Sequence, residues 1–177
     1  NTFLGITQTL SPKELMEEQI KNSHYVYMEG YLVASPTGKE AAIKARKIAE
    51  ENNVKTALTF SDVNMVTYFA EGLSEMIGNG VDLLFCNEAE AYAYTKTNSV
   101  AEAAAALKKI AKAFAITLGP KGAFLFDGDK EVFVVTTPVQ AIDTNGAGDL
   151  FAGAFLYAIN HGISFAEAAK LGCAASS

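Results

Sequence analysis

The feature that most restricts how this chain can fold is an alternation of short apolar segments with longer segments of helical composition. The apolar segments are expected to form buried strands, at residues 25–33, 54–60, 81–86 and 114–118. The segments between them are expected to be helical, at residues 37–53, 62–77 and 99–113. Strands that alternate with helices predict an α/β protein with a mostly parallel central sheet flanked by helices.

The last third of the chain has a different pattern. Residues 123–126 and 131–135 are apolar and are separated by the turn-like Asp127-Gly128-Asp129, which predicts a β-hairpin. Two helices are expected to follow, at residues 147–160 and from Ser164 onward, with His161-Gly162 as the break between them. The chain has 177 residues, half of them apolar, and shows no internal repeat or linker, which suits one compact domain.

Charge and cysteine content exclude several classes of protein. The formal net charge of -6 argues against a nucleic-acid binder that neutralises many phosphates. No apolar run approaches the roughly 18 residues of a membrane span, and no secretory leader opens the chain, so we expect no membrane partner and a cytoplasmic location. Cys86 and Cys173 are far apart and have no metal-type spacing, which favours buried, reduced thiols.

The segment 143–149 has the features of a phosphate-handling catalytic corner. Gly146, Ala147 and Gly148 carry almost no side chain, so their backbone N–H groups can approach an anion closely. The helix that follows directs the positive end of its dipole to the same place. Asp149 at this helix start could accept a proton from a substrate hydroxyl while the amides hold developing negative charge.

A simpler interpretation of this segment stays open. Asp143, Thr144 or Asn145 could satisfy free N–H groups of the first helical turn, as in any ordinary helix start. Glycine-rich turns before helices are common, so the spacing alone does not decide between a cap and a catalytic loop.

Two further polar motifs follow predicted strands. Asn87 and Glu90 follow the third predicted strand, and residues 117–122, Thr-Leu-Gly-Pro-Lys-Gly, follow the fourth. Ligands of open α/β sheets bind beyond the carboxyl ends of the strands, so these motifs and Asp149 are expected to converge at one sheet edge. Asn87 with Glu90 also has the spacing of a helix capping box, and residues 117–122 could be a plain turn.

The string DTNGAGDLFAGAFL at residues 143–156 resembles the C-terminal signature of the PfkB, or ribokinase-like, family of carbohydrate and nucleoside kinases. Residues 87–90 resemble the family's Asn-x-x-Glu motif, and residues 117–122 its Thr-x-Gly-x-x-Gly motif, in the same order. The resemblance implies a ribokinase-like three-layer fold. It also implies that the protein uses ATP with Mg2+ to phosphorylate a hydroxyl group of a sugar or nucleoside.

The resemblance assigns roles to individual residues. Asp149 would be the catalytic base, and the anion hole would be formed by Gly146, Ala147 and Gly148. The nucleotide would lie against Asn87, Thr117, Gly119, Gly122 and Gly148. Glu90 would lie near Mg2+ through ordered water, and Asp143 with the backbone carbonyl of Asn145 would bind a monovalent cation such as K+.

Members of the family that these motifs resemble are longer than this chain. Residues 1–177 are therefore expected to be the C-terminal nucleotide-binding portion of the kinase domain, with the fold incomplete at both ends. The N-terminal substrate and lid part and the C-terminal tail would be absent, so the 177 residues alone are expected to be inactive. A homodimer is a further expectation from the family.

Two questions stay open at this point. Asn145 is similar to the form found in adenosine kinases, but one position does not separate a sugar from a nucleoside acceptor. A catalytically silent nucleotide-binding or regulatory module with the same fold is the alternative function. A Rossmann-type dehydrogenase is more remote, because no Gly-x-Gly-x-x-Gly follows the early strands.

Overall fold

A single six-stranded sheet runs through the molecule, in the order β1-β2-β3-β4-β5-β6. The structure is a computed structural model that describes residues 5–137, 139 and 143–177. The first four strands are parallel and the last two are antiparallel. Their bounds are Tyr25–Glu29 (β1), Lys55–Thr59 (β2), Val81–Asn87 (β3), Ala111–Thr117 (β4), Ala123–Phe126 (β5) and Glu131–Val134 (β6).

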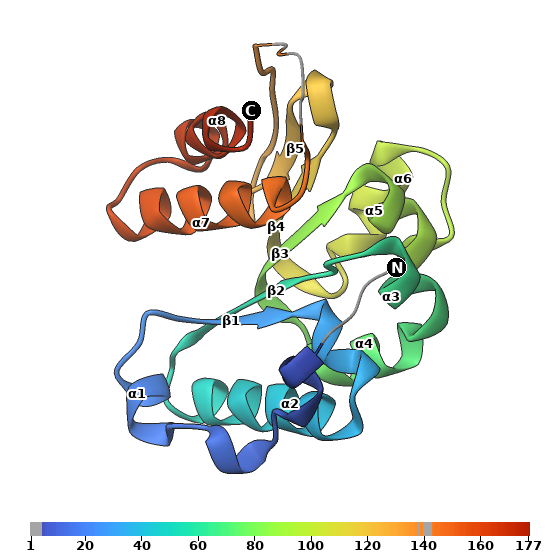
Figure 1. The fold of residues 1–177 in the computed structure, drawn as a ribbon. Coiled ribbons are helices and arrows are strands. Elements are labelled where there is room, and N and C mark those ends of the chain that lie inside the picture. The colour runs from blue at the N-terminus through green and yellow to red at the C-terminus, as the bar shows by residue number, and fades with distance from the viewer. Residues whose placement is uncertain (1–4, 138, 140–142) are drawn as a thin grey trace.

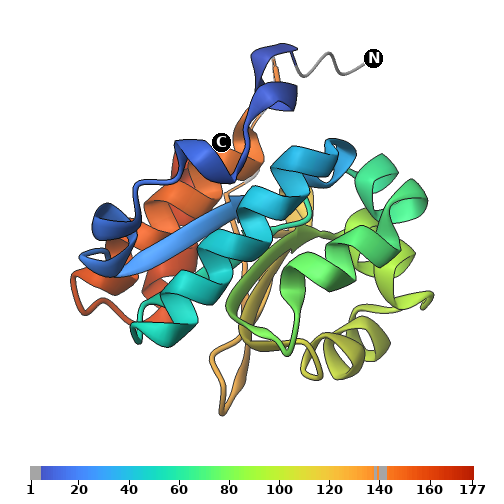
Figure 2. The ribbon, with the colours of Figure 1, turned by 90° about the horizontal axis from the view of Figure 1, so that it is seen from below.

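Helices cover both faces of this sheet, which gives three layers (Figures 1 and 2). One face is covered by α2 (Pro36–Glu51), α3 (Val63–Tyr68), α4 (Ala70–Ile77), α5 (Glu88–Thr95) and α6 (Val100–Leu107). The opposite face is covered by α7 (Ala147–Asn160) and α8 (Phe165–Ala175). The predicted α/β architecture with a mostly parallel sheet is confirmed.

The strands contribute to two hydrophobic cores because successive side chains point to opposite faces. In β3, Leu84 packs toward α2–α6, while Leu83 and Phe85 pack toward α7 and α8. Phe151 and Phe155 of α7 are fully buried there, and both rings lie edge-on to Phe85. This packing fixes the start of α7 beside the carboxyl end of β3.

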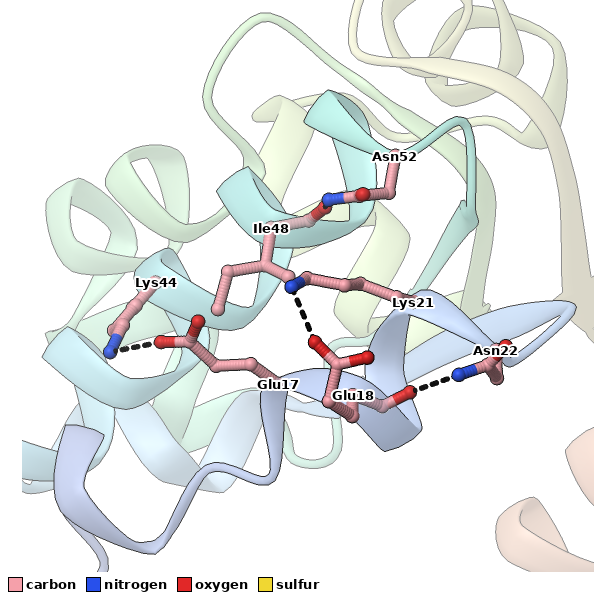
Figure 3. Close-up of polar contacts among 7 residues, drawn as sticks. All are labelled: Glu17, Glu18, Lys21, Asn22, Lys44, Ile48 and Asn52. Carbon is pink, nitrogen blue, oxygen red and sulfur yellow. Dashed lines mark hydrogen bonds and ion pairs between the residues drawn. The ribbon is translucent and has the colours of Figure 1, made fainter.

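The short helix α1 (Glu17–Lys21) lies against α2 and is tied to it by polar contacts (Figure 3). Glu17 forms an ion pair with Lys44 of α2 at 2.8 Å. Within α1, Lys21 pairs with Glu18 at 2.7 Å, and the Asn22 side chain donates to the Glu18 carbonyl at 2.7 Å. These groups are largely exposed, so they position α1 more than they stabilise the fold.

Several predicted boundaries were wrong. The strand predicted at 25–33 ends at Glu29, and the chain continues in a 3-10 segment, Gly30–Ala34, whose first residue lies so close to the Phe60 carbonyl that a Cβ would clash with it. The helix predicted at 62–77 is two helices that meet at Phe69. The helix predicted at 99–113 ends at Leu107, because Ala111 and Ala113 pair with β3 in the sheet, where burial overrides the helix propensity of alanine.

One helix, α5, was not among the predicted elements, although the capping-box spacing of Asn87 and Glu90 admits it. Cys86 and Cys173 are buried and free, as predicted. Within the ranges that the structure describes, no helix is long and apolar enough to cross a membrane.

Candidate active site

A cavity of about 700 Å3 opens at the carboxyl ends of β2, β3 and β4, next to the start of α7. In parallel α/β sheets this edge is where ligands bind, because loops there carry polar groups that are not used by the sheet. Ten of the residues predicted to form the site line this cavity: Asn87, Glu90, Thr117, Gly119, Gly122, Asn145, Gly146, Ala147, Gly148 and Asp149. The predicted convergence of the three motifs is therefore present.

Asp143 is the predicted site residue that does not line the cavity. Its carboxylate accepts a hydrogen bond from the Asn145 N–H at 2.9 Å, which closes a tight turn before α7. Asp143 thus forms a turn before α7, which is one of the two roles considered for it from the sequence. A role with a cation would have to coexist with this turn.

The start of α7 leaves space in front of its first amides. Gly146 is the N-cap residue with φ of 77°, a left-handed conformation that favours glycine. It has no side chain to cap the N–H groups of the first turn, of which the Ala147 N–H donates to the Thr144 carbonyl at 3.2 Å. A Cβ placed on Gly146 or Gly148 would meet no atom of the surrounding described residues within 4 Å, so packing against those residues does not require a glycine at either position. An anion can therefore approach this turn.

Asn87 and Glu90 form a complete capping box at the start of α5. The Asn87 side chain accepts from the Glu90 N–H at 2.8 Å, and the Glu90 carboxylate accepts from the Asn87 N–H at 2.9 Å and from its side-chain amide at 2.8 Å. Glu90 is only 5% exposed. Burial raises the pKa of Glu90 to about 7, the hydrogen bond from the Asn87 backbone opposes this rise, and the charge of Asp62 adds to it. A nearby cation would favour its ionised form.

The turn after β4 is held by its own backbone. The Leu118 N–H donates to the Gly122 carbonyl at 2.8 Å, and Gly122 has φ of 106°. A Cβ on Gly122 would overlap the carbonyl oxygen of Val134. Backbone packing therefore requires a glycine at this position, whatever its role in the cavity wall. The Lys121 side chain is exposed, is not among the lining residues, and pairs with Glu88 at 3.6 Å.

Sequence reasoning missed a group of residues at the ends of β1 and β2. Tyr31, Ser61 and Asp62 line the cavity. The half-buried Glu29 is not a lining residue, but its carboxylate accepts a hydrogen bond from the Ser61 hydroxyl at 2.8 Å. Burial raises the pKa of Tyr31, and the charges of Asp62, Glu90, Asp149 and Glu29 add to the rise. The strand-end rule that located Asn87 could have located these residues as well.

The charged side chains among the described lining residues are all acidic. Asp62, Glu90 and Asp149 are its carboxylates, and the described lining residues include no Lys, Arg or His. Among the described residues no three metal-ligating side chains cluster closely enough to form an all-protein metal site. This donor set fits Mg2+ that is held by one carboxylate, waters and nucleotide phosphates, because Mg2+ keeps several waters and prefers oxygen ligands.

Comparisons with known proteins identify relatives along the whole chain. The family model for the pfkB family carbohydrate kinases matches residues 1–177. Ribokinase of Haemophilus influenzae is 34% identical over 167 residues, which cover 90% of this chain and 50% of that protein. Adenosine kinase from Sinorhizobium meliloti superposes with a TM-score of 0.90 at 33% identity and covers 96% of this chain and 52% of that one.

A third similarity concerns the fold alone. A protein from E. coli described as a Ribokinase II, solved in complex with ATP and Mg2+, superposes with a TM-score of 0.85 at 21% identity over 95% of this chain and 56% of that one. The chain belongs to the pfkB family of carbohydrate kinases. It spans about half the length of the curated relatives that it matches.

Proposed function

We propose that this chain supplies the nucleotide-binding and catalytic portion of an ATP-dependent kinase that phosphorylates a hydroxyl group of a sugar or nucleoside. The observation that carries the proposal is the arrangement of three separate motifs around one cavity: the Asn87–Glu90 box, the Gly119 turn, and the corner from Gly146 to Asp149. Relatives named as a ribokinase and an adenosine kinase support the same reaction class.

In this proposal the nucleotide lies between the turn at Gly119 and the capping box of α5, with its phosphates directed at the start of α7. Mg2+ with ATP supplies the positive charge that the described lining lacks, and Glu90 holds it through water. The amides at the start of α7, of which that of Ala147 also donates to the Thr144 carbonyl, and the dipole of this helix stabilise negative charge on the transferred phosphoryl group. Asp143 and the Asn145 carbonyl hold a monovalent cation beside this turn.

Asp149 acts at the acceptor. Its carboxylate takes or orients the proton of the attacking hydroxyl, whose oxygen forms the new bond to the γ-phosphorus while the bond to the β-phosphate oxygen breaks. Phosphoryl transfer demands mainly positioning and charge stabilisation, so no covalent intermediate on the protein is needed. Other contacts to the acceptor come from sequence outside the 177 residues, since the relatives are about twice as long.

A phosphorylation assay tests the proposal. The complete natural protein is incubated with ATP and Mg2+ and a panel of neutral sugars and nucleosides, and phosphorylated products are measured by mass. We expect transfer to at least one acceptor, with loss of transfer when Mg2+ is chelated. Nucleotide binding without transfer to any acceptor would contradict the kinase proposal and would favour the silent module.

A further inference from the structure

We propose that the ion pair between Lys121 and Glu88 is a latch on the nucleotide side of the cavity, which ties the turn after β4 to the start of α5 and slows the release of bound nucleotide. The inference deepens the proposed kinase function and rests on it. Lys121 and Glu88 are positioning residues, since neither of them lines the cavity.

The pair lies at the rim of the cavity, between two of the three motifs that form it. Lys121 Nζ is 3.6 Å from a carboxylate oxygen of Glu88. The residues directly before and after each of the two line the cavity: Asn87, Ala89, Pro120 and Gly122. A contact between the two charged side chains therefore restrains the separation of the two walls between which the nucleotide is proposed to lie.

The turn after β4 has its hydrogen bonds within itself. The Leu118 N–H donates to the Gly122 carbonyl at 2.8 Å, and the Gly122 N–H donates to the Gly119 carbonyl at 3.0 Å. Within the described part of the chain no hydrogen bond joins residues 118–122 to α5, so the ion pair is the polar link between them. The attachment of this wall to α5 therefore depends on the pair.

The Glu88 carboxylate is held where Lys121 can reach it. Glu88 begins α5, where the helix dipole favours a negative charge, and the Tyr92 hydroxyl donates to the same carboxylate oxygen at 3.1 Å. The side chains of Lys121 and Glu88 are 68% and 36% exposed, so their pairing changes an equilibrium by only about fivefold or less. A contact of this strength suits a latch that opens whenever nucleotide enters or leaves.

A charge-reversal series in the complete natural protein tests the latch. Release of the fluorescent analogue N-methylanthraniloyl-ATP with Mg2+ is measured by stopped flow, with excess ATP as competitor. The variants are Lys121→Glu, Glu88→Lys, and the double exchange, which restores an ion pair with the charges swapped. Lys108→Glu is the matched control, because Lys108 pairs with Glu131 of β6 at 2.7 Å and neither residue lines the cavity.

We expect each single reversal to speed release about three- to tenfold, because attraction at the rim becomes repulsion. The double exchange should return the rate to within about twofold of the wild type, and Lys108→Glu should leave it unchanged. Wild-type rates in both single variants, or an equal change in Lys108→Glu, would overturn the inference. A double exchange that releases as fast as Lys121→Glu would also overturn it, because Lys121 would then contact the nucleotide itself.

Neutral variants give a second measurement that adds no repulsion. Glu88→Gln and Lys121→Met should each speed release about two- to fivefold, and the two changes together should have no larger effect than either alone. Additive effects would show that the two residues act separately and would contradict the latch. Failure of the wild type to bind the analogue with Mg2+ would overturn the proposed nucleotide-binding function as well.

Discussion

Gly148 is not required to be a glycine by packing against the described residues. It lies in the first turn of α7 with a helical backbone, and a Cβ there would meet no surrounding atom within 4 Å in the part of the chain that the structure describes. The same is true of Gly153 in the middle of α7, which does not line the cavity. Gly148 lines the cavity and Gly153 does not. A comparison of the two positions therefore separates an effect on ligand binding from an effect on folding.

Gly148→Ala is expected to lower turnover at least about tenfold, because a methyl group would occupy space that the transferred phosphoryl group needs. The same change should leave the free energy of unfolding unchanged or raise it by up to ~1 kcal/mol, since alanine is the better helix former. Gly153→Ala should give a similar stability change with normal turnover. Steady-state kinetics and urea unfolding of both variants measure this, and normal turnover in Gly148→Ala would contradict the assignment.

Glu90 makes stability depend on pH in a predictable direction. Its pKa is raised to about 7 in the fold, mainly by burial, against an ordinary value of 4.5. A raised carboxyl pKa contributes stability that is fully present below pH 4.5 and is lost as pH rises through 7. In the absence of Mg2+ and nucleotide, this group should therefore destabilise the protein progressively between these values.

Glu90→Gln should remove this dependence, because the amide stays neutral at every pH. Relative to the wild type, the variant is expected to gain unfolding free energy between pH 5 and 8, by about 1 to 3 kcal/mol. Chemical denaturation at several pH values without divalent ions gives the difference. A difference that is flat across this range would show that Glu90 titrates at its ordinary pKa.

At the scale of elements, the hairpin of β5 and β6 depends on the turn that precedes it. Gly122 has φ of 106°, and a Cβ there would overlap the Val134 carbonyl oxygen of β6. Gly119 in the same turn has φ of 57°, and a Cβ there would meet no atom of the surrounding described residues within 4 Å. One glycine is required by backbone packing and the other only by its own conformation.

Gly122→Ala is expected to cost more than ~2 kcal/mol of unfolding free energy, because strain and a backbone overlap combine. Gly119→Ala should cost only about 1 kcal/mol, the penalty for alanine in a left-handed conformation. Thermal and urea unfolding of the two variants measure the difference. Equal stabilities would mean that the turn can shift away from β6.

The elements also show what local sequence can predict. The helix predicted at residues 147–160 has the observed bounds, because a glycine-rich start and a His-Gly end mark it clearly. The segment 62–77, predicted as one helix, is broken at Phe69, and neither Gly nor Pro stands at that position to signal the break. Ala111 and Ala113 were assigned to a helix by composition, yet pairing with β3 places them in a strand. Whether such a segment forms a helix or a strand is decided by tertiary contacts.

At the scale of the whole molecule, the alternation of strands and helices predicted the α/β architecture, and the strand-end rule predicted the convergence of three motifs. The three-layer arrangement was expected from the family resemblance. It did not predict Glu29, Ser61 or Asp62 in the site. The strand-end rule could have pointed to these residues, but the contact between Glu29 and Ser61 depends on the pairing of β1 with β2 and on the left-handed backbone of Ser61, which local composition does not specify. The missed residues are those whose role requires distant parts of the chain to meet.

The central claim is that the corner at the start of α7 transfers a phosphoryl group with Asp149 as base. The most direct measurement compares kcat and MgATP affinity of the complete wild-type protein with those of Asp149→Asn. Asp129→Asn, in the exposed hairpin turn away from the cavity, makes the same chemical change as a control. We predict that kcat of Asp149→Asn falls about 100-fold or more while MgATP still binds. A folded Asp149→Asn protein with near-normal kcat would contradict the account.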